Sequence, residues 1–448
     1  MMHVEAFRQA RVGSSAPLRQ MLIIGGTSDL SRRHLLPALT SLLARGELPE
    51  GFSLALTGLE SMSAEACRSL LAQELSVHAA HLPADAGRAL VARTAYLRAD
   101  VRDMDALRAV TVTEPLLVYV ATPPGAVPAA LRALARADIH RSARLVLDKP
   151  YGLSRTSAHA LNAQILELTG ERNVYRIDHF LYHHAVQELV RWRVQSDPLS
   201  LVDLLPVAEV EIVWDETRVV DQSSRPSYCG VMRDMIQSHL LQLAAVITME
   251  SPKSMTRADL TRNRLDALRR ISADVDSGLI RGRYVRDSDT NTSPATREEA
   301  ETFVTLALHS QMPRWENVRF FLRAAKGLDQ SQRHIELRFA HRSAEPSLGF
   351  VRLEVLGGNL VLGLTGRDAS PVEFAVSAET ESASTRLLRA ALVGEDTFTL
   401  HPEEPEEAWR IVEPLLRAWE KSEAPMLTYR VGASAANIAR SGAEPGGA

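Results

Sequence analysis

The chain has 448 residues, of which 45% are hydrophobic and 24% charged, and its 51 basic and 55 acidic side chains give a formal net charge of −4. This composition excludes a disordered, collagen-like or membrane-spanning chain, and the length predicts two or three domains with large cores. Because no block of lysine and arginine stands out, we expect no nucleic-acid partner and no membrane partner. A multi-domain enzyme is the class that remains.

The cysteines and the two ends of the chain bear on its location. Cys67 and Cys229 supply neither a disulfide framework nor a thiolate metal cluster. The N-terminal segment carries arginines but lacks the apolar core of a signal peptide. We therefore expect a cytoplasmic protein with a mobile N-terminus over residues 1–18 and a mobile tail over residues 439–448.

In the first part of the chain, short apolar runs alternate with segments of helical spacing. The runs predict buried parallel strands at residues 21–24, 53–57, 116–121, 144–147 and 173–177. Helices are predicted at residues 63–79, 102–111, 126–137 and 153–169, and another, capped by Asp29, after the first strand. This alternation predicts an α/β domain with a doubly wound parallel sheet over residues 19–178.

After residue 200 apolar and polar residues alternate strictly, which is typical of strands with one buried face. Such strands are predicted at residues 208–214, 302–308, 318–322, 335–339, 351–355 and 360–364. Helices are predicted at residues 180–196, 231–249, 256–279, 383–393 and 405–421, and an exposed loop at residues 286–296. We expect an α+β domain over residues 179–438, built on a large mixed or antiparallel sheet with helices.

A glycine-rich turn joins the first strand to its helix and is a candidate cofactor site. Backbone N–H groups of such a turn, together with the helix dipole, can hold a pyrophosphate. The turn consists of Gly25, Gly26, Thr27, Ser28, Asp29 and Leu30. The second strand ends near Glu60, whose carboxylate would accept hydrogen bonds from an adenosine ribose and repel a 2′-phosphate. This favours NAD over NADP, although a solvated Glu60 in a loop is an equal alternative.

Two further strands end in residues that suit a ligand site, because open α/β sheets bind ligands at the carboxyl ends of their strands. Ala121, Thr122 and Pro123 follow one strand, where the prolines would form a rigid wall of the cofactor site. Lys149 leaves the next strand and would hydrogen-bond a substrate hydroxyl or border the cofactor. The alternative for Lys149 is an ordinary surface lysine.

Asp178 and His239 are a candidate pair for proton transfer. His239 belongs to an apolar helical stripe, so its imidazole is predicted to be buried and to need a polar partner. A carboxylate such as Asp178 would fix the tautomer and stabilise the protonated ring. The alternative is a histidine that serves only the core. His179 and His183 have the spacing of zinc ligands, but no third ligand is evident in the sequence, and we expect no metal.

Four segments of the chain, taken in order, match one known family. They are Gly-Gly-Thr-Ser-Asp-Leu from residue 25, Asp-Lys-Pro-Tyr-Gly from residue 148, Arg-Ile-Asp-His-Phe from residue 176 and Arg-Asp-Met-Ile-Gln-Ser-His-Leu-Leu-Gln from residue 233. With further matches over residues 20–430, the chain resembles the glucose-6-phosphate 1-dehydrogenase family. The resemblance implies a Rossmann domain, a second domain whose large sheet pairs subunits into a homodimer or a dimer of dimers, and hydride transfer from C1 of the sugar to NAD or NADP.

The resemblance also implies roles for single residues. His239 falls on the general base that removes the C1 hydroxyl proton, and Asp178 falls on the carboxylate that orients it. The implied substrate contacts are Lys149, Lys326, Asp234 and Asp215 with the sugar, and His179 with the phosphate.

The chain departs from the family at the implied phosphate site. Phe180 replaces a tyrosine, His183 stands in the segment that carries a lysine in the family, and Ser331 aligns near another basic residue. Charge-assisted contacts contribute about 1.5–3 kcal/mol each, so two losses would weaken phosphate binding unless His183, His184 or Arg333 substitutes.

Three hypotheses for the function follow. The first is oxidation of C1 of glucose 6-phosphate by NAD or NADP, giving the 6-phosphogluconolactone, with His239 as general base. The second is a divergent paralogue that oxidises a different sugar or sugar phosphate. The third is a non-catalytic nucleotide-binding relative, which would not need a buried base with its orienting carboxylate.

Overall fold

The computed structural model describes residues 18–443, apart from gaps at 104, 111–114, 140–142, 172, 196–205, 221–227, 275–278, 286–299, 341–347, 365–370, 376–379 and 422–425. The loop predicted at 286–296 lies outside the described residues. Of the expected mobile N-terminus only Leu18 is described, and of the expected tail only residues 439–443 are described. The chain divides into two compact units. Unit 1 comprises Met1–Asp148, Gln164–Tyr175 and Ser384–Asp396; unit 2 comprises Lys149–Ala163, Arg176–Ala383 and Thr397–Ala448.

A six-stranded sheet forms the core of unit 1. Its strands are β1 (Gln20–Ile24), β2 (Ser53–Gly58), β3 (Thr94–Arg98), β4 (Leu116–Val120), β5 (Arg144–Asp148) and β6 (Val174–Ile177), and their order is β3-β2-β1-β4-β5-β6. Strands β1 to β5 pair in parallel. This is the strand order of a Rossmann sheet, in which the chain adds strands on one side of β1 up to β3 and then returns to add β4, β5 and β6 on the other side. The predicted doubly wound parallel sheet is confirmed.

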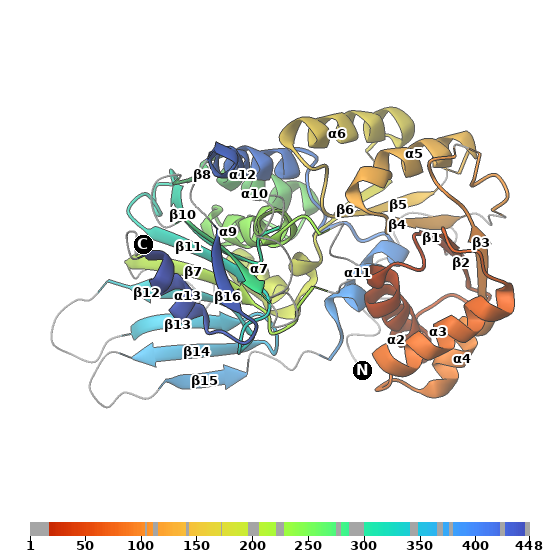
Figure 1. The fold of residues 1–448 in the computed structure, drawn as a ribbon, viewed down its shortest axis with the longest axis horizontal. Helices are drawn as coiled ribbons and strands as arrows, with labels where there is room; N and C mark the ends of the chain where they lie inside the picture. The colour runs from red at the N-terminus through yellow and green to blue at the C-terminus, as the bar shows by residue number, and fades with distance from the viewer. Residues whose placement is uncertain are drawn as a thin grey trace. The chain divides into compact units, whose positions relative to one another are not determined.

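Helices cover both faces of the sheet in unit 1. They include α2 (Leu36–Ala44), α3 (Ala64–His78), α4 (Ala84–Ala92), α5 (Val127–Arg136) and α11 (Ala383–Val393). In Figure 1, α5 lies on one face of the sheet and α2, α3 and α4 lie on the other. Ser63 caps α3, since its hydroxyl oxygen accepts the backbone N–H of Ala66 at 3.1 Å.

The helix predicted at residues 102–111 is wrong. The described part of this segment forms turns. Asp100 accepts the backbone N–H of Arg102 at 3.0 Å, and Asp103 accepts that of Asp105 at 3.0 Å. Such local bonds from aspartate compete with the helical hydrogen bonds of the backbone.

Unit 2 is built on a ten-stranded mixed sheet. Its strands are β7 (Val207–Asp215), β8 (Ile271–Ala273), β9 (Ile280–Val285), β10 (Phe303–Ser310), β11 (Arg319–Ala325), β12 (Gln332–Phe339), β13 (Leu348–Glu354), β14 (Asn359–Leu364), β15 (Val372–Ala375) and β16 (Leu427–Arg430). The order is β15-β14-β13-β12-β7-β11-β10-β9-β16, with β8 on β10. Strand β11 runs parallel to β7 and β16 runs parallel to β9, while the other pairs are antiparallel.

The helices of unit 2 include the 3₁₀ helix η3 (His179–Tyr182), α7 (His184–Gln195), the π-helix η5 (Met232–Leu240), α9 (Leu241–Thr248), α10 (Arg257–Arg269), α12 (Glu403–Lys421) and α13 (Ala435–Ala443). The residues of α6 (Arg155–Thr169) are divided between the two units. The helix predicted at 256–279 is too long, because the chain leaves α10 and pairs with β10 as β8. Helix α13 extends through residues that we expected in a mobile tail. No helix in the described ranges is long and apolar enough to cross a membrane.

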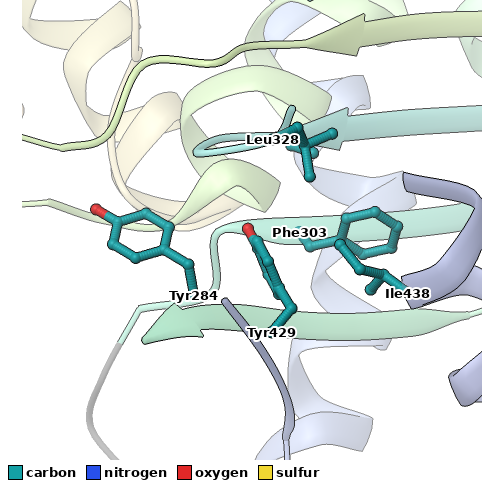
Figure 2. Close-up of a cluster of buried hydrophobic side chains, with 6 residues drawn as sticks. Tyr284, Phe303, Leu328, Tyr429 and Ile438 are labelled. Atoms are coloured by element: carbon teal, nitrogen blue, oxygen red, sulfur yellow. The ribbon is translucent and has the colours of Figure 1, made fainter. Parts of the chain in front are cut away.

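A cluster of apolar side chains supports the end of β11 (Figure 2). Its buried members are Tyr284, Phe303, Ala325, Leu328, Tyr429 and Ile438. The Tyr429 hydroxyl lies 2.7 Å from the backbone oxygen of Lys326, to which it can donate. The cluster therefore fixes the backbone from which the Lys326 side chain extends.

Candidate active site

Two parallel strands and one helix of unit 2 bring the charged groups of the site together. Asp215 of β7 pairs with Ala325 of β11, so Glu216 and Lys326 leave the sheet at the same edge. Helix η5 packs against both strands. It carries Asp234 and His239, which are five residues apart. Because a π-helix bonds residue i to residue i+5, these two side chains share a face.

Asp178 and His239 form a buried hydrogen-bonded pair. Asp178 follows β6 and caps η3, where its carboxylate accepts the backbone N–H of Phe180 at 2.9 Å. Nδ1 of His239 lies 2.5 Å from Oδ1 of the same carboxylate, and the side chains are 1% and 0% exposed. The Phe180 ring stacks on the imidazole at 3.9 Å with an interplanar angle of 6°. The structure thus brings together the two residues predicted for proton transfer.

The remaining ring nitrogen of His239 is available to a ligand. Nε2 is buried and has no hydrogen-bond partner within the described ranges. Burial and then the positive charge of Lys149 hold the pKa of His239 well below its usual value, so the ring is neutral near pH 7. Burial raises the pKa of Asp178 to about 7. Near neutrality the pair holds one proton between Nδ1 and Oδ1, and Nε2 can accept another.

Two lysine–carboxylate pairs form a cluster, and Lys149, Asp234 and Lys326 of this cluster are near His239. Nζ of Lys149 lies 2.8 Å from Oδ1 of Asp234, and Nζ of Lys326 lies 2.9 Å from Oε2 of Glu216 and 3.9 Å from Oδ2 of Asp234. Burial alone would raise the pKa of Asp234, but Lys149 and Lys326 outweigh it and hold that pKa below its usual range. Lys326 likewise outweighs burial and lowers the pKa of Glu216. The two carboxyls are therefore ionised near pH 7, and together with the lysines paired to them they can bind sugar hydroxyls.

The structure does not bring Asp215 to this cluster. Successive residues of a strand face opposite sides of the sheet. The Asp215 carboxylate is instead 3.1 Å from Nε of Arg323, and burial raises its pKa to about 6. Glu216, which we did not predict, takes the place in the cluster. The alternation that puts Ile212 and Trp214 on one face continues to Glu216, so the signal was in the sequence.

An aromatic side chain joins the implied phosphate residues to this cluster. The Arg333 guanidinium lies over the Trp214 ring at 5.3 Å and its Nη2 is 3.7 Å from Oε1 of Glu216. The ring of His183, which is buried, lies 5.8 Å from that of Trp214. His184 instead faces Glu188 of α7, at 3.9 Å. Of the three expected substitutes, Arg333 and His183 are therefore the two next to Trp214.

His179 also lies beside the Asp178–His239 pair. Its ring is 4.6 Å from that of His239. Ligand atoms of Asp178, His179 and His239 lie within 4.8 Å of one another, a spacing that a metal ion could use. His183, which the sequence offered as the partner of His179, is not part of that group. The bond between Oδ1 of Asp178 and Nδ1 of His239 explains the close approach of this pair, and the expectation of no metal stays a prediction.

In unit 1 the glycine-rich turn is held tightly at the carboxyl edge of the sheet. The N–H groups of Gly25 and Gly26 both donate to the oxygen of Thr57, at 3.0 and 2.7 Å. Gly25 has φ +86°, and a Cβ there would come within 2.6 Å of the oxygen of Ala121. A Cβ at Gly26 would come within 2.7 Å of the Leu56 side chain. Only glycine fits these two positions.

The cap of the following helix is Ser28, and the prediction of Asp29 is wrong. The Ser28 hydroxyl oxygen accepts the backbone N–H of Ser31 at 3.3 Å. Asp29 turns away and pairs with Arg32 at 2.8 Å. The neighbouring arginines compete for its carboxylate, which the local sequence pattern did not reveal. Leu30 follows at the start of the helix, half-buried.

The other predicted cofactor residues of unit 1 lie beside this turn. Oε2 of Glu60 accepts the Thr27 hydroxyl at 2.7 Å, which places Glu60 against the turn, while its side chain stays exposed to solvent. The N–H of Ala121 donates to the oxygen of Ile24 at 2.8 Å. The hydroxyl of Thr122 is buried without a hydrogen-bond partner in the described part of the chain, and Pro123 precedes a 3₁₀ turn. Lys149 belongs to unit 2.

Comparison with known proteins decides the family. Residues 22–188 match the model of the glucose-6-phosphate dehydrogenase NAD binding domain, and residues 203–349 match that of the glucose-6-phosphate dehydrogenase C-terminal domain. The chain belongs to the glucose-6-phosphate dehydrogenase family. This confirms the resemblance read from the four sequence segments, and with it the Rossmann domain and the mixed-sheet domain.

Relatives and solved structures of the family cover most of the chain. It is 28% identical to a glucose-6-phosphate 1-dehydrogenase of Treponema pallidum, over 94% of this chain and 92% of that one. It is 30% identical to a glucose-6-phosphate 1-dehydrogenase of Mycobacterium bovis, over 73% of this chain and 75% of that one. The crystal structure of the enzyme from Mycobacterium avium has a TM-score of 0.79 at 26% identity, covering 94% of this chain and 95% of that one. A glucose-6-phosphate dehydrogenase in complex with its substrate glucose-6-phosphate has the same fold, with a TM-score of 0.79 at 20% identity, covering 98% and 100%.

Proposed function

We propose that this chain oxidises C1 of glucose 6-phosphate with a nicotinamide cofactor and releases the 6-phosphogluconolactone. One observation carries the proposal: His239 presents an unbonded, buried Nε2 beside two lysine–carboxylate pairs, while Asp178 holds its Nδ1. A pair of this kind serves proton transfer, and the lysines and carboxylates serve a polyhydroxylated substrate. Membership of the family supports the same reaction.

The chemistry of the step follows from this geometry. Nε2 of His239 accepts the proton of the C1 hydroxyl while the C1–H bond breaks and the C1–O bond becomes a carbonyl. The Asp178 carboxylate stabilises the imidazolium that forms. An oxidised nicotinamide, when bound, would supply the acceptor for the hydride that leaves C1. Lys149, Lys326 and the two carboxylates hold the ring hydroxyls, so that C1 stays at Nε2.

We further propose that Arg333, His183 and His179 take up the 6-phosphate. Arg333 is stacked on Trp214 and is only weakly engaged by Glu216, at 3.7 Å, so its guanidinium can turn towards an anion. This cation offsets the loss of the basic residue near Ser331. The divergent-paralogue hypothesis rested on that loss, and the relatives named for glucose 6-phosphate do not favour it.

NAD is the proposed cofactor of preference. The Glu60 carboxylate is fixed at the glycine-rich turn by the Thr27 hydroxyl, where it would accept bonds from a ribose and repel a 2′-phosphate. A cytoplasmic location and a homodimer or a dimer of dimers belong to the same proposal. Sedimentation at several protein concentrations measures the assembly.

A substrate panel tests the proposed function. The purified chain is assayed with NAD and with NADP against glucose 6-phosphate, glucose, galactose 6-phosphate and mannose 6-phosphate, following the reduced nicotinamide by absorbance. We expect glucose 6-phosphate to give the highest kcat/KM, and glucose a value lower by about 100-fold, since charge-assisted phosphate contacts are lost. A higher kcat/KM for another sugar would support the paralogue hypothesis. No turnover with any pair would support a non-catalytic relative.

A further inference from the structure

The hydroxyl of Tyr228 is a buried polar group that the proposed mechanism has not used. Its oxygen is buried and has no hydrogen-bond partner among the described residues. Other tyrosines of unit 2 differ in this respect: the hydroxyl of Tyr151 donates to the oxygen of Ile177 at 2.9 Å, and that of Tyr284 accepts the N–H of Val220 at 3.0 Å. Because buried hydroxyls are normally satisfied, an unbonded one calls for a partner that binds there.

The backbone that follows Tyr228 is held by contacts with Glu301. The Glu301 carboxylate accepts the N–H of Met232 at 2.9 Å, and the Glu301 backbone oxygen accepts that of Val231 at 3.0 Å. Gly230 has φ +87°, and a Cβ there would come within 2.3 Å of the same carboxylate. The backbone just after Tyr228 is therefore held by several contacts, and helix η5 with Asp234 follows directly.

Tyr228 stands two residues before Gly230, whose backbone oxygen accepts the N–H of Asp234 at 2.9 Å, so it lies near the lysine–carboxylate cluster. Burial, then the negative charges of Asp234 and Glu301, and also that of Glu216, hold the pKa of its phenol well above the usual value. The phenol is thus a neutral donor near the active-site carboxylates. Asp234 and Glu216 are already paired with Lys149 and Lys326. No residue in the described ranges occupies the phenol, so a hydroxyl of a bound sugar can accept its hydrogen bond.

We propose that the Tyr228 phenol donates a hydrogen bond to one ring hydroxyl of the sugar, next to the hydroxyls held by Asp234 and Glu216, and so takes part in selecting the sugar. This inference rests on the proposed function. It adds a substrate-binding residue that neither the motifs nor the ion pairs of the site include.

The variant Tyr228→Phe removes only this hydroxyl. We expect KM for glucose 6-phosphate to rise roughly five- to tenfold, the range for one neutral hydrogen bond, with kcat within about twofold of the parent. Because the hydroxyl has no partner among the residues that the structure describes, Tm without substrate should stay the same or rise. The matched control is Tyr284→Phe, which loses its bond to Val220. It should lower Tm and leave KM unchanged.

Deoxy analogues identify the contacted hydroxyl. The parent and Tyr228→Phe are compared on glucose 6-phosphate and on its 2-deoxy, 3-deoxy and 4-deoxy forms. For each substrate we take the ratio of kcat/KM of the parent to kcat/KM of Tyr228→Phe, as in a double-mutant cycle. We expect this ratio to be about one with the analogue that lacks the contacted hydroxyl and about five to ten with the other substrates. The same ratio with all four substrates would overturn the inference, and so would a Tm that falls as in Tyr284→Phe. If the parent oxidises glucose 6-phosphate and the variant matches it, this inference alone fails. If the parent does not, the proposed function fails as well.

Discussion

At the scale of single residues, the account depends on which proton each group holds. Asp178 and His239 share one proton, because burial lowers the pKa of the imidazole and raises that of the carboxyl to about 7. Phe180 fixes the ring from its face and Asp178 fixes it at Nδ1. The ring therefore cannot rotate to offer the wrong nitrogen, and Nε2 is the site of proton uptake.

Asp178→Asn tests the orienting role. An amide of the same size keeps the packing, but it can donate to Nδ1 and stabilise the wrong tautomer, and it carries no charge to balance the imidazolium. We expect kcat to fall about 10³- to 10⁴-fold, with KM for glucose 6-phosphate changed only a few-fold. Steady-state kinetics measure both. A variant whose kcat stays within about tenfold of the parent would show that Asp178 has only a structural role.

The pH dependence of kcat has a definite sign. His239 must be neutral to accept the proton, and its pKa is lowered from 6.5. Protonation of His239, or of the Asp178 carboxyl whose pKa burial raises to about 7, therefore removes activity on the acid side: kcat should decline as pH falls through about 7 and be level well above it. The carboxyls of Asp234 and Glu216 have lowered pKa values and stay ionised through this range. An acid limb with its midpoint above about pH 8 would contradict the assignment of the pair, because neither Asp178 nor His239 has a pKa in that range.

At the scale of elements, strand ends and helix register build the two binding regions. In unit 1 the end of β2 brings Glu60 against the turn that follows β1, with Oε2 2.7 Å from the Thr27 hydroxyl. In unit 2 the π-helical register of η5 puts Asp234 and His239 on one face, above the ends of β7 and β11. Each region is therefore formed where elements distant in sequence end at one edge of a sheet.

Glu60→Ala tests cofactor choice at the end of β2. Removing the carboxylate removes a ribose acceptor and the repulsion of a 2′-phosphate. The ratio of kcat/KM for NADP to that for NAD should rise about tenfold or more, a shift that the loss of one charge contact can produce. Glu47→Ala removes a glutamate of unit 1 that pairs with Arg389 and is the matched control. Equal ratios in Glu60→Ala and Glu47→Ala would contradict the proposed lean towards NAD.

The sequence predicted elements where local pattern and burial agree, and missed those that depend on tertiary pairing. The continuous apolar runs of β1 and β4 are buried along their whole length. Strand β3 was missed because it pairs with β2 alone at the sheet edge and has no fully buried residue. Strand β8 lies inside the helix predicted at 256–279. The helical spacing of the sequence continues through it, and only its pairing with β10 makes it a strand.

The candidate site was predictable where a motif specified it and not where register decides it. Asp178, His239, Lys149, Asp234 and Lys326 lie in recognisable segments, and the structure brings their side chains together. Asp215 is assigned by the resemblance alone, and the register of β7 turns it to Arg323 while Glu216 meets Lys326. Asp234 and His239 are five residues apart, a spacing that puts two side chains on different faces of an α-helix. They lie on one face here because η5 is a π-helix, which the sequence pattern does not reveal.

At the scale of the whole molecule, a buried ion pair ties together the helices of unit 2. Nε of Arg264 in α10 lies 3.1 Å from Oε2 of Glu404 in α12, with the side chains 1% and 0% exposed. Nη2 of Arg264 also donates to the oxygen of Thr399 at 2.7 Å. A charge buried this deeply requires its partner, because desolvation without compensation is costly.

Glu404→Gln tests this contribution to stability. The variant leaves the Arg264 guanidinium without its counter-charge, and the free energy of unfolding should fall by about 3–5 kcal/mol. Denaturant titration measures the change. Glu403→Gln is the matched control, since Glu403 pairs with Arg269 at 2.5 Å while both are about half exposed. That variant should lose less than about 1 kcal/mol. Equal losses in the two variants would contradict the view that the buried pair holds α10 and α12 together.

The most direct test of the account is the turnover of His239→Asn set against its cofactor affinity. The variant keeps a polar side chain but has no basic nitrogen at the position of Nε2. The account predicts that kcat with glucose 6-phosphate falls by about 10³-fold or more, while the Kd of the cofactor, measured by calorimetry, stays within about twofold. Turnover at the level of the parent enzyme would contradict the central claim that His239 is the base for oxidation at C1.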